Sequence, residues 1–339
     1  MFRKILIANR GEIAVRIIRA ARELGIATVA VYSTADKEAL HTLLADEAIC
    51  IGPGKATESY LNINAILSAA VLTEAEAIHP GFGFLSENSK FATMCDEVGI
   101  KFIGPSGAVM DTMGDKINAR EQMIKAGVPV IPGSDGEVHT AEEALAVAEK
   151  IGYPVMLKAS AGGGGKGIRK VEKAEDLVAA FETASSEAKA NFGNGAMYLE
   201  RVIYPARHIE VQILADQEGH VVHLGERDCS LQRNNQKVLE ESPSIAIGKT
   251  LRHEIGAAAV RAAESVGYEN AGTIEFLLDE ASGNFYFMEM NTRVQVEHPV
   301  TEFVSGVDIV KEQIRIAAGQ PLPFHQEGSI VITSDNSAV

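Results

Sequence analysis

Polar and apolar side chains alternate between Glu289 and Glu297, in the stretch "EMNTRVQVE". At the two-residue period of a β-strand, one face carries the polar side chains Glu289, Asn291, Arg293, Gln295 and Glu297. The opposite face carries Met290, Thr292, Val294 and Val296. This alternation predicts a strand with one buried face. Its polar face is either a solvated surface or the floor of a reaction site.

A further carboxylate, Glu275, is expected to face Glu289 across a hairpin. The predicted strands "GTIEFLLD" and "NFYFMEMN" flank a turn near residues 280–284, and pairing them in register sets the two carboxylates opposite each other. Like charges in that position destabilise a ladder, so we expect either a shared proton or a bound cation. With Asn291 on the same face, the oxygens suit Mg²⁺ or Mn²⁺ held mainly through nucleotide phosphates.

A glycine-rich loop, "AGGGGKG" at residues 161–167, joins two predicted strands. Glycines let backbone amides close over phosphate oxygens, although a flexible hairpin tip would have the same composition. A Walker A loop is excluded, because that loop leads into a helix and ends in Gly-Lys-Ser/Thr. Lys158 precedes the loop and is placed either to pair with a phosphate or to extend along the surface. Together with the facing carboxylates, the loop and the lysine favour a metal–nucleotide site.

Two weaker polar groups lie between these elements. One strand face carries His208, Glu210 and Gln212, which are either structural partners or part of a site. The segment "QRNNQK", which ends in Lys237, is either an anion contact or a surface loop.

The first hundred residues alternate predicted strands and helices. Apolar strands are expected at 4–9, 26–32, 77–80 and 101–104, with helices at 11–25, 65–71 and 88–99. This pattern predicts a parallel sheet with helices on both faces. The turn after the first strand has one glycine where a dinucleotide fingerprint needs three, so NAD binding is disfavoured.

After Gly114 the pattern changes to a second, mixed arrangement. A helix capped by Asp115 is followed by a strand–loop–strand unit over 153–171, a helix over 175–190 and a strand over 196–203. Antiparallel strands dominate from Arg207 to Glu297, with a helix over 251–266 between them. The fold class is therefore α/β, with a parallel N-terminal domain followed by an α+β domain.

Composition sets bounds on the class of protein. A length of 339 residues suits about two domains, and 46% hydrophobic with 23% charged residues is typical of a globular protein. The net charge of −15 disfavours a general nucleic-acid binder. Cys50, Cys95 and Cys229 are odd in number and far apart, which predicts reduced thiols in a cytoplasmic protein. No apolar run approaches the length of a membrane span.

The motifs, taken in order, resemble the biotin carboxylases of acetyl-CoA carboxylase, in the ATP-grasp superfamily. The matching stretches are "KILIANRGEIAVRIIRAARELG", "HPGFGFLSEN", "FIGP", "MGDK", "KASAGGGGKG", "RHIEVQ", "GERDCSLQR", "GTIEFLLD" and "EMNTRVQVEHPVTE". The resemblance implies a pre-ATP-grasp domain over 1–114 and an ATP-grasp domain over 115–326, with a mobile glycine-loop lid over 131–203. A tail over 327–339 departs from the family.

The resemblance also implies roles, residue by residue. ATP would be bound by Lys116, Lys158, Gly163, Gly164, Gly165, Lys166, Gly167, Glu200, Arg201, Val202, Ile203, His208, Gln232, Asn235, Glu275 and Glu289. Metal ligands would be Glu275, Glu289 and Asn291, the residues that the hairpin argument selects. Bicarbonate would contact Lys237, Arg293, Gln295 and Val296. The catalytic residues would be Arg293, Glu297 and Lys237, with Glu297 as the base that deprotonates bicarbonate.

The implied reaction is ATP-dependent carboxylation of biotin on a carrier protein, with bicarbonate activated as carboxyphosphate. It is the first half-reaction of acetyl-CoA carboxylase in fatty-acid synthesis. The implied cofactors are ATP, two Mg²⁺ or Mn²⁺ ions, and biotin as carboxyl acceptor. The implied partners are a biotin carboxyl carrier protein, carboxyltransferase subunits and a second copy in a homodimer, with no nucleic acid and no membrane.

The chain departs from the family's pattern at Asn234–Asn235 and after Glu327. The family continues into a domain whose arginine holds the enolate of biotin, so we expect biotin carboxylation by this chain to be impaired. Two alternatives are an MgATP-binding module without turnover and a carbamoyl-phosphate-type ligase, which also activates bicarbonate. The stretch "RVQVEHPVTE" favours biotin.

Overall fold

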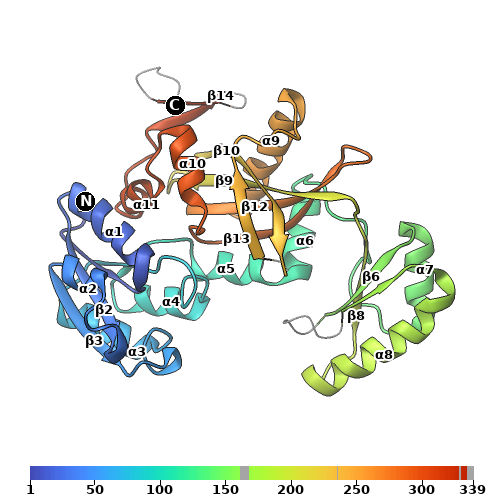
Figure 1. The fold of residues 1–339 in the computed structure, drawn as a ribbon, viewed down its shortest axis with the longest axis horizontal. Coiled ribbons are helices and arrows are strands. Elements are labelled where there is room, and N and C mark those ends of the chain that lie inside the picture. The colour runs from blue at the N-terminus through green and yellow to red at the C-terminus, as the bar shows by residue number, and fades with distance from the viewer. Residues whose placement is uncertain (161–167, 235, 328–329, 334–339) are drawn as a thin grey trace. The chain divides into compact units, whose positions relative to one another are not determined.

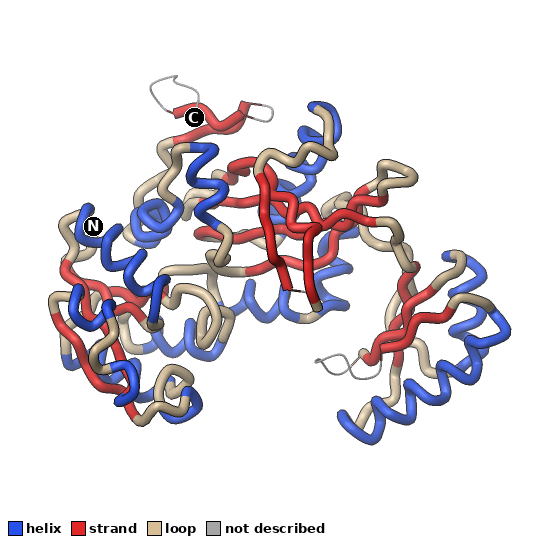
Figure 2. The backbone as a smooth tube through the Cα atoms, in the orientation of Figure 1, coloured by secondary structure: helices blue, strands red, loops and turns tan. Residues whose placement is uncertain are grey.

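A computed structural model of the chain describes residues 1–160, 168–234, 236–327 and 330–333. The chain forms two compact units. The larger unit comprises Met1–Val128, Arg207–Phe276 and Met288–Val339, and the smaller comprises Pro129–Ala206 and Leu277–Phe287. Figure 1 labels the elements and Figure 2 separates helices, strands and loops. The sequence-derived domains 1–114 and 115–326 and the lid 131–203 stay predictions.

A five-stranded parallel sheet forms the N-terminal part of the larger unit (Figure 1). Its strands, in the order β3-β2-β1-β4-β5, are β1 (Lys4–Ile7), β2 (Ala27–Ser33), β3 (Glu47–Gly52), β4 (Ala77–His79) and β5 (Lys101–Phe102). The helices between them are α1 (Gly11–Glu23), α2 (Leu40–Leu44), α3 (Ile63–Leu72) and α4 (Ser89–Glu97). The predicted parallel sheet is confirmed. β3 escaped sequence analysis because it is an edge strand with largely exposed side chains.

A second five-stranded sheet provides most of the polar residues of interest. In the order β11-β10-β9-β12-β13 it contains β9 (Ala206–Ala215), β10 (Val221–Arg233), β11 (Gln236–Glu241), β12 (Asn270–Asp279) and β13 (Phe285–Asn291). The associated helices are α5 (Gly107–Gly114), α6 (Lys116–Lys125), α9 (Lys249–Ser265), α10 (His298–Ser305) and α11 (Ile309–Ala317). Both α9 and α10 pack against β10. A two-stranded hairpin, β14 (Phe324–Glu327) with β15 (Ile330–Thr333), follows.

One apolar core joins the two sheets of the larger unit. It includes Ile5 and Ile17 from the N-terminal part together with Leu214, Val294 and Ile314 from the later elements. These side chains are completely buried. Burial of apolar surface stabilises by about 25 cal/mol per Å², so the N-terminal sheet and the central sheet support each other.

The smaller unit contains a three-stranded antiparallel sheet and two helices. The strands β6 (Val155–Ala159), β7 (Ile168–Val171) and β8 (Met197–Arg201) take the order β7-β6-β8, and the helices are α7 (Ala141–Ile151) and α8 (Ala174–Phe192). The predicted strands and the long helix are confirmed. The glycine-rich loop itself lies outside the described residues.

The predicted strand over 289–297 is wrong beyond Asn291. β13 ends at that residue, and α10 begins at His298 with Pro299 in its first turn. Proline suits the first turn of a helix because an N–H group there has no intrahelical partner. The sequence "EHPV" therefore starts a helix where the alternation of polar and apolar residues suggested a continuing strand.

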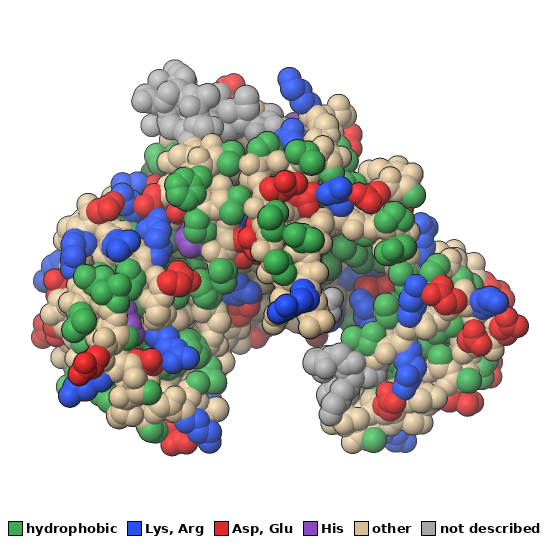
Figure 3. Space-filling model, viewed as in Figure 1, with side chains coloured by type: hydrophobic (Ala, Val, Ile, Leu, Met, Phe, Trp, Pro, Cys, Tyr) green, Lys and Arg blue, Asp and Glu red, His purple; other side chains and the backbone are tan. Residues whose placement is uncertain are grey.

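Two surface properties accompany this fold. In the part of the chain that the structure describes, no helix is both long and apolar enough to cross a membrane. On the face seen in Figure 3, acidic and basic side chains are interspersed. Cys50, Cys95 and Cys229 are free thiols, as predicted.

Two histidines of the larger unit are buried in their neutral form. His79 ends β4, and its Nδ1 accepts the N–H of Gly81 at 3.1 Å, so Nδ1 carries no proton. His298 begins α10, and its Nδ1 donates to the carbonyl of Gln295 at 2.8 Å. Burial lowers the pKa of His79 to about 3 and the pKa of His298 to about 4.

We expect these histidines to make the protein sensitive to acid. The unfolded chain takes up protons below a histidine pKa of 6.5, whereas the folded protein does not until about pH 4 or 3. Stability is thus complete above pH 6.5 and falls as the pH drops, by about 1.4 kcal/mol per pH unit for each histidine. Urea unfolding between pH 5 and 7 would show a weaker pH dependence for His298→Gln than for the parent. The exposed His253→Gln variant is the control, and an equal slope in all three proteins would contradict the assignment.

Candidate active site

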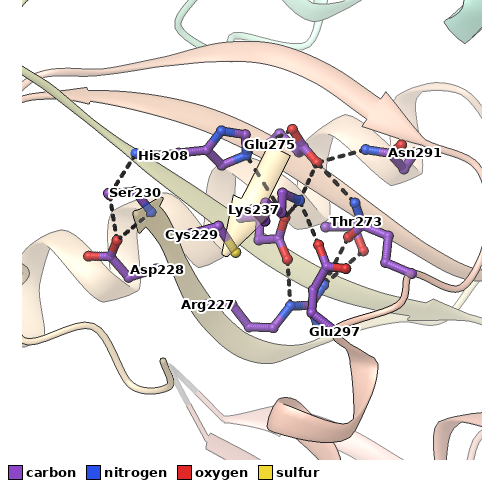
Figure 4. Close-up of polar contacts among 12 residues, drawn as sticks. His208, Arg227, Asp228, Cys229, Ser230, Lys237, Thr273, Glu275, Asn291 and Glu297 are labelled. Carbon is purple, nitrogen blue, oxygen red and sulfur yellow. Dashed lines mark hydrogen bonds and ion pairs between the residues drawn. The ribbon is translucent and has the colours of Figure 1, made fainter. Parts of the chain in front are cut away.

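The ammonium of Lys237, on β11, lies among three carboxylates (Figure 4). Its Nζ is 2.9 Å from Glu275 Oε1 and 2.6 Å from Glu297 Oε1, and it also contacts Glu210. All three carboxylates are buried, and Lys237 is 18% exposed. These four residues are called the lysine cluster below.

Electrostatic interactions keep the members of the lysine cluster charged. Burial lowers the pKa of Lys237, but Glu210 and Glu275 outweigh burial and raise it well above its usual value. Burial raises the pKa of Glu275, but His208 and Lys237 outweigh that effect and lower it to about 2. The pKa of Glu297 is likewise lowered, because Lys237 outweighs the desolvation of the carboxylate. Both glutamates are therefore ionised at neutral pH.

Arg227, on β10, holds the cluster in place and is completely buried. Its five N–H groups donate to Glu210 Oε1 (2.5 Å), Gln212 Oε1 (2.9 Å), Thr301 Oγ1 (2.9 Å), Gln295 Oε1 (3.0 Å) and Thr273 Oγ1 (3.3 Å). A guanidinium has five N–H donors, so every donor is used within the protein. Arg227 consequently orients its neighbours and has no donor left for a ligand.

Glu275 connects the lysine cluster to the end of β13. Its Oε1 accepts hydrogen bonds from Asn291 Nδ2 at 2.8 Å and Gln295 Nε2 at 2.9 Å. Its Oε2 lies 2.8 Å from His208 Nε2. The amide nitrogen of Gln232, held by a bond to the carbonyl of Cys229, lies 3.2 Å from His208 Nδ1. Because that nitrogen donates, the proton of a neutral His208 sits on Nε2 and faces Glu275.

The donor set at this point suits a hard divalent cation. Partial desolvation, and next the negative charge of Glu275, raise the pKa of Glu289, so the two carboxylates are neighbours as predicted. The side chain of Glu289 remains exposed, which weakens the desolvation effect and leaves its oxygens available. Lys237 and Arg227 together also leave one of the three cluster carboxylates uncompensated. Glu275, Glu289 and Asn291 offer the oxygen ligands that Mg²⁺ prefers.

Most of the predicted site residues come together in the larger unit. They are Lys116, His208, Gln232, Lys237, Glu275, Glu289, Asn291, Arg293, Gln295, Val296 and Glu297. Lys116, at the start of α6, is close enough to lower the pKa of Glu289. Gln295 and Glu297 are buried, whereas Val296 is 61% exposed.

Five other predicted residues belong to the smaller unit: Lys158, Glu200, Arg201, Val202 and Ile203. Lys158 on β6 pairs with Glu200 on β8, and the N–H of Val202 donates to the carbonyl of Pro154 at 2.8 Å. Their roles toward ATP stay predictions. Gly163, Gly164, Gly165, Lys166, Gly167 and Asn235 lie outside the described residues.

Two charged residues of the site were missed or undervalued from sequence. Glu210 was noticed only as part of a weak polar face, and Arg227 was not singled out. Their pairing depends on a register shift between His223 and Glu226, where Gly225 has a φ of 86°. This bulge places Arg227 opposite Glu210. The glycine within the strand was the one available signal.

Two protein families match the sequence. The family described as "Biotin carboxylase, N-terminal domain" matches residues 1–110, and the one described as "Carbamoyl-phosphate synthase L chain, ATP binding domain" matches residues 115–325. Biotin carboxylase of Nostoc sp. is 60% identical over 326 residues, and biotin carboxylase 1 of Bacillus subtilis is 57% identical over 327 residues. Each alignment covers 96% of this chain and 73% of the relative.

Solved structures give the same result. The biotin carboxylase of Campylobacter jejuni, solved as a beta-gamma-ATP complex, is 54% identical with a TM-score of 0.88 over 95% of this chain and 72% of that chain. The biotin carboxylase domain of a thermophilic 2-oxoglutarate carboxylase, solved with bicarbonate, is 52% identical with a TM-score of 0.91. The latter comparison covers 97% of this chain and 72% of that chain.

We expect Lys237→Met to destabilise the protein strongly, because it leaves three buried carboxylates without their ammonium. Breaking a buried ion pair from one side costs about 3–5 kcal/mol, measurable by urea unfolding at pH 7. The loss should shrink toward pH 5, since without Lys237 the pKa values of Glu275 and Glu297 rise and protonation relieves their repulsion.

The matched control for this variant is Lys101→Met. Lys101 Nζ lies 3.0 Å from Glu269 in a pair that is partly exposed, and such pairs contribute up to about 1 kcal/mol. Equal losses for the two lysine variants would show that the cluster does not depend on Lys237.

Proposed function

The chain belongs to the biotin carboxylase family, and from that premise we propose how its own residues perform the reaction. It is an ATP-dependent carbon–nitrogen ligase with an ATP-grasp fold that carboxylates biotin with bicarbonate. The observation that carries the proposal is the lysine cluster beside Arg293. An ionised Glu297, a guanidinium and an ammonium at one place are the groups needed to hold and deprotonate a bicarbonate ion.

Glu297 is proposed as the base. Its pKa is lowered, so it is ionised and able to accept the proton of bicarbonate. The freed oxygen attacks the γ-phosphorus of ATP, ADP leaves, and carboxyphosphate forms. Carboxyphosphate then breaks down to CO₂ and phosphate. Phosphate takes the proton from the ureido nitrogen of biotin, and that nitrogen bonds to CO₂.

Arg293 and Lys237 are proposed to hold bicarbonate during this step. The guanidinium of Arg293 can bind two oxygens of one anion in a planar fork. Mg²⁺ held by Glu275, Glu289 and Asn291 would neutralise negative charge on the phosphates of ATP. Lys116, close to Glu289, is suited to neutralise further phosphate charge.

We also propose the setting in which this reaction serves. Relatives include chloroplastic biotin carboxylases and one of the subunits of a pyruvate carboxylase from Methanothermobacter thermautotrophicus, so the acyl acceptor is chosen downstream of this chain. The proposed setting is acetyl-CoA carboxylase, with biotin on a carboxyl carrier protein, with carboxyltransferase subunits, and with a second copy of the chain as a dimer partner.

If Glu297 is the base, Glu297→Gln removes the proton acceptor while keeping the size of the side chain. We expect bicarbonate-dependent ADP release to fall by about 10²–10⁴-fold, the usual contribution of a general base. ATP affinity, measured by calorimetry, should stay near that of the parent. The exposed Glu254→Gln variant on α9 is the control. A loss smaller than about tenfold would argue against this role.

The metal ligands are tested with Glu275→Gln and Glu289→Gln. Each change removes an anionic oxygen from the proposed Mg²⁺ site, so the Mg²⁺ concentration that gives half-maximal ADP release should rise. Affinity for metal-free ATP should change much less. An unchanged Mg²⁺ dependence in both variants would exclude these carboxylates as ligands.

A further inference from the structure

Glu87 connects the N-terminal part of the chain to Arg293. Its Oε1 accepts the N–H of Thr292 at 3.0 Å, and its Oε2 accepts Arg293 Nε at 2.9 Å. One carboxylate thus holds both the backbone and the guanidinium of the segment that follows β13. The contact joins residues 206 positions apart in the sequence.

The bond from Glu87 determines which edge of Arg293 is available. Arg293 Nη2 donates to Asn291 Oδ1 at 2.8 Å, and Nη1 donates to the carbonyl of Val294 at 3.4 Å. With Nε bound to Glu87, three of the five N–H groups are engaged by described residues. One N–H remains on Nη1 and one on Nη2, the pair that grips a carboxylate with two bonds. The side chain is 21% exposed, so a ligand can reach it.

The turn that carries Glu87 is strained. Gly81, Gly83 and Phe84 have φ values of 63°, 67° and 44°. Left-handed backbone is natural for glycine but is an outlier for a bulky aromatic residue. Such conformations cost of order 1–3 kcal/mol each and persist where the surroundings enforce them. They are concentrated at functional sites.

The surroundings of this turn do enforce it. Asn9 Nδ2 donates to the carbonyls of Pro80 and Phe82, both at 2.7 Å. The ring of Phe84 stacks on Tyr60 at 5.0 Å between centroids, and the guanidinium of Arg10 lies 5.8 Å from the Phe84 ring.

On the other side of Glu87, the neighbouring residues are also fixed. Ser86 is buried, and Asn88 caps α4 by accepting the N–H of Phe91 at 2.9 Å. The position of Glu87 is therefore set from both directions along the chain.

We propose that Glu87 is a positioning residue for bicarbonate binding, acting through Arg293. By holding Nε it turns the Nη1–Nη2 edge toward the anion, before any ligand arrives. The inference rests on the proposed function in one respect, namely that Arg293 holds bicarbonate. It adds a role for the N-terminal turn, which contributes no group of its own to the lysine cluster.

The test is Glu87→Gln, which keeps the size of the side chain but removes its charge. Loss of a charge-assisted hydrogen bond should raise the KM for bicarbonate roughly fivefold or more, while the KM for ATP stays unchanged. In an Arg293→Lys background the same change should add nothing, because the guanidinium on which Glu87 acts is gone. Additive effects, equal changes in both KM values, or no change would overturn the proposal.

Glu76→Gln is the matched control. Glu76 accepts the N–H and the Nε–H of Arg3, both at 2.7 Å, in the same backbone-plus-guanidinium pattern but away from the lysine cluster. This variant should leave the KM for bicarbonate unchanged.

A readout that needs no turnover separates this inference from the proposed function. If the parent releases no ADP in response to bicarbonate, the proposed function fails. The Nε–H resonance of Arg293, assigned with Arg293→Lys, still reports the bond to Glu87. Glu87→Gln should shift that resonance and speed its exchange with solvent, and Glu76→Gln should not. An unaffected resonance would exclude the positioning role.

Discussion

Three carboxylates can be buried side by side in this protein only because cations share the space with them. Removing a charge from water costs several kcal/mol unless another charge and hydrogen bonds replace the solvent. Lys237 contacts Glu210, Glu275 and Glu297, and Arg227 donates to Glu210 from the opposite side. The remaining negative charge explains why this place suits a metal ion and why it cannot collapse into an apolar core.

This balance of charge depends on the order of the strands. Glu210 comes from β9, Arg227 from β10, Lys237 from β11 and Glu275 from β12, four strands that are adjacent in one sheet. Each strand therefore supplies one charge to its neighbours, and a change of strand order would leave a buried charge unpaired. Arg227 also reaches Thr301 on α10, so the helix that follows Glu297 is tied to the same network. Stability and chemistry thus depend on the same contacts.

Periodicity alone predicted the local structure and part of the site. It was sufficient for the parallel sheet and for the pairing of Glu275 with Glu289, because both follow from local patterns. It failed after Asn291, where a helix start replaced the strand. Arg227 was missed because a bulge at Gly225 decides which residue faces Glu210. Glu87 was missed for a different reason, since its partner is distant in sequence and its turn has no periodic pattern.

The contrast between the two arginines shows what the sequence cannot distinguish. Both lie among apolar and polar neighbours in segments of similar composition, and both bond to a glutamate. Arg227 has all five donors engaged and is completely buried, so its function is to hold the site together. Arg293 has three donors engaged by described residues and stays partly exposed, so it can still bind an anion. Whether an arginine is structural or ligand-binding is therefore decided by its donor count, which only the fold determines.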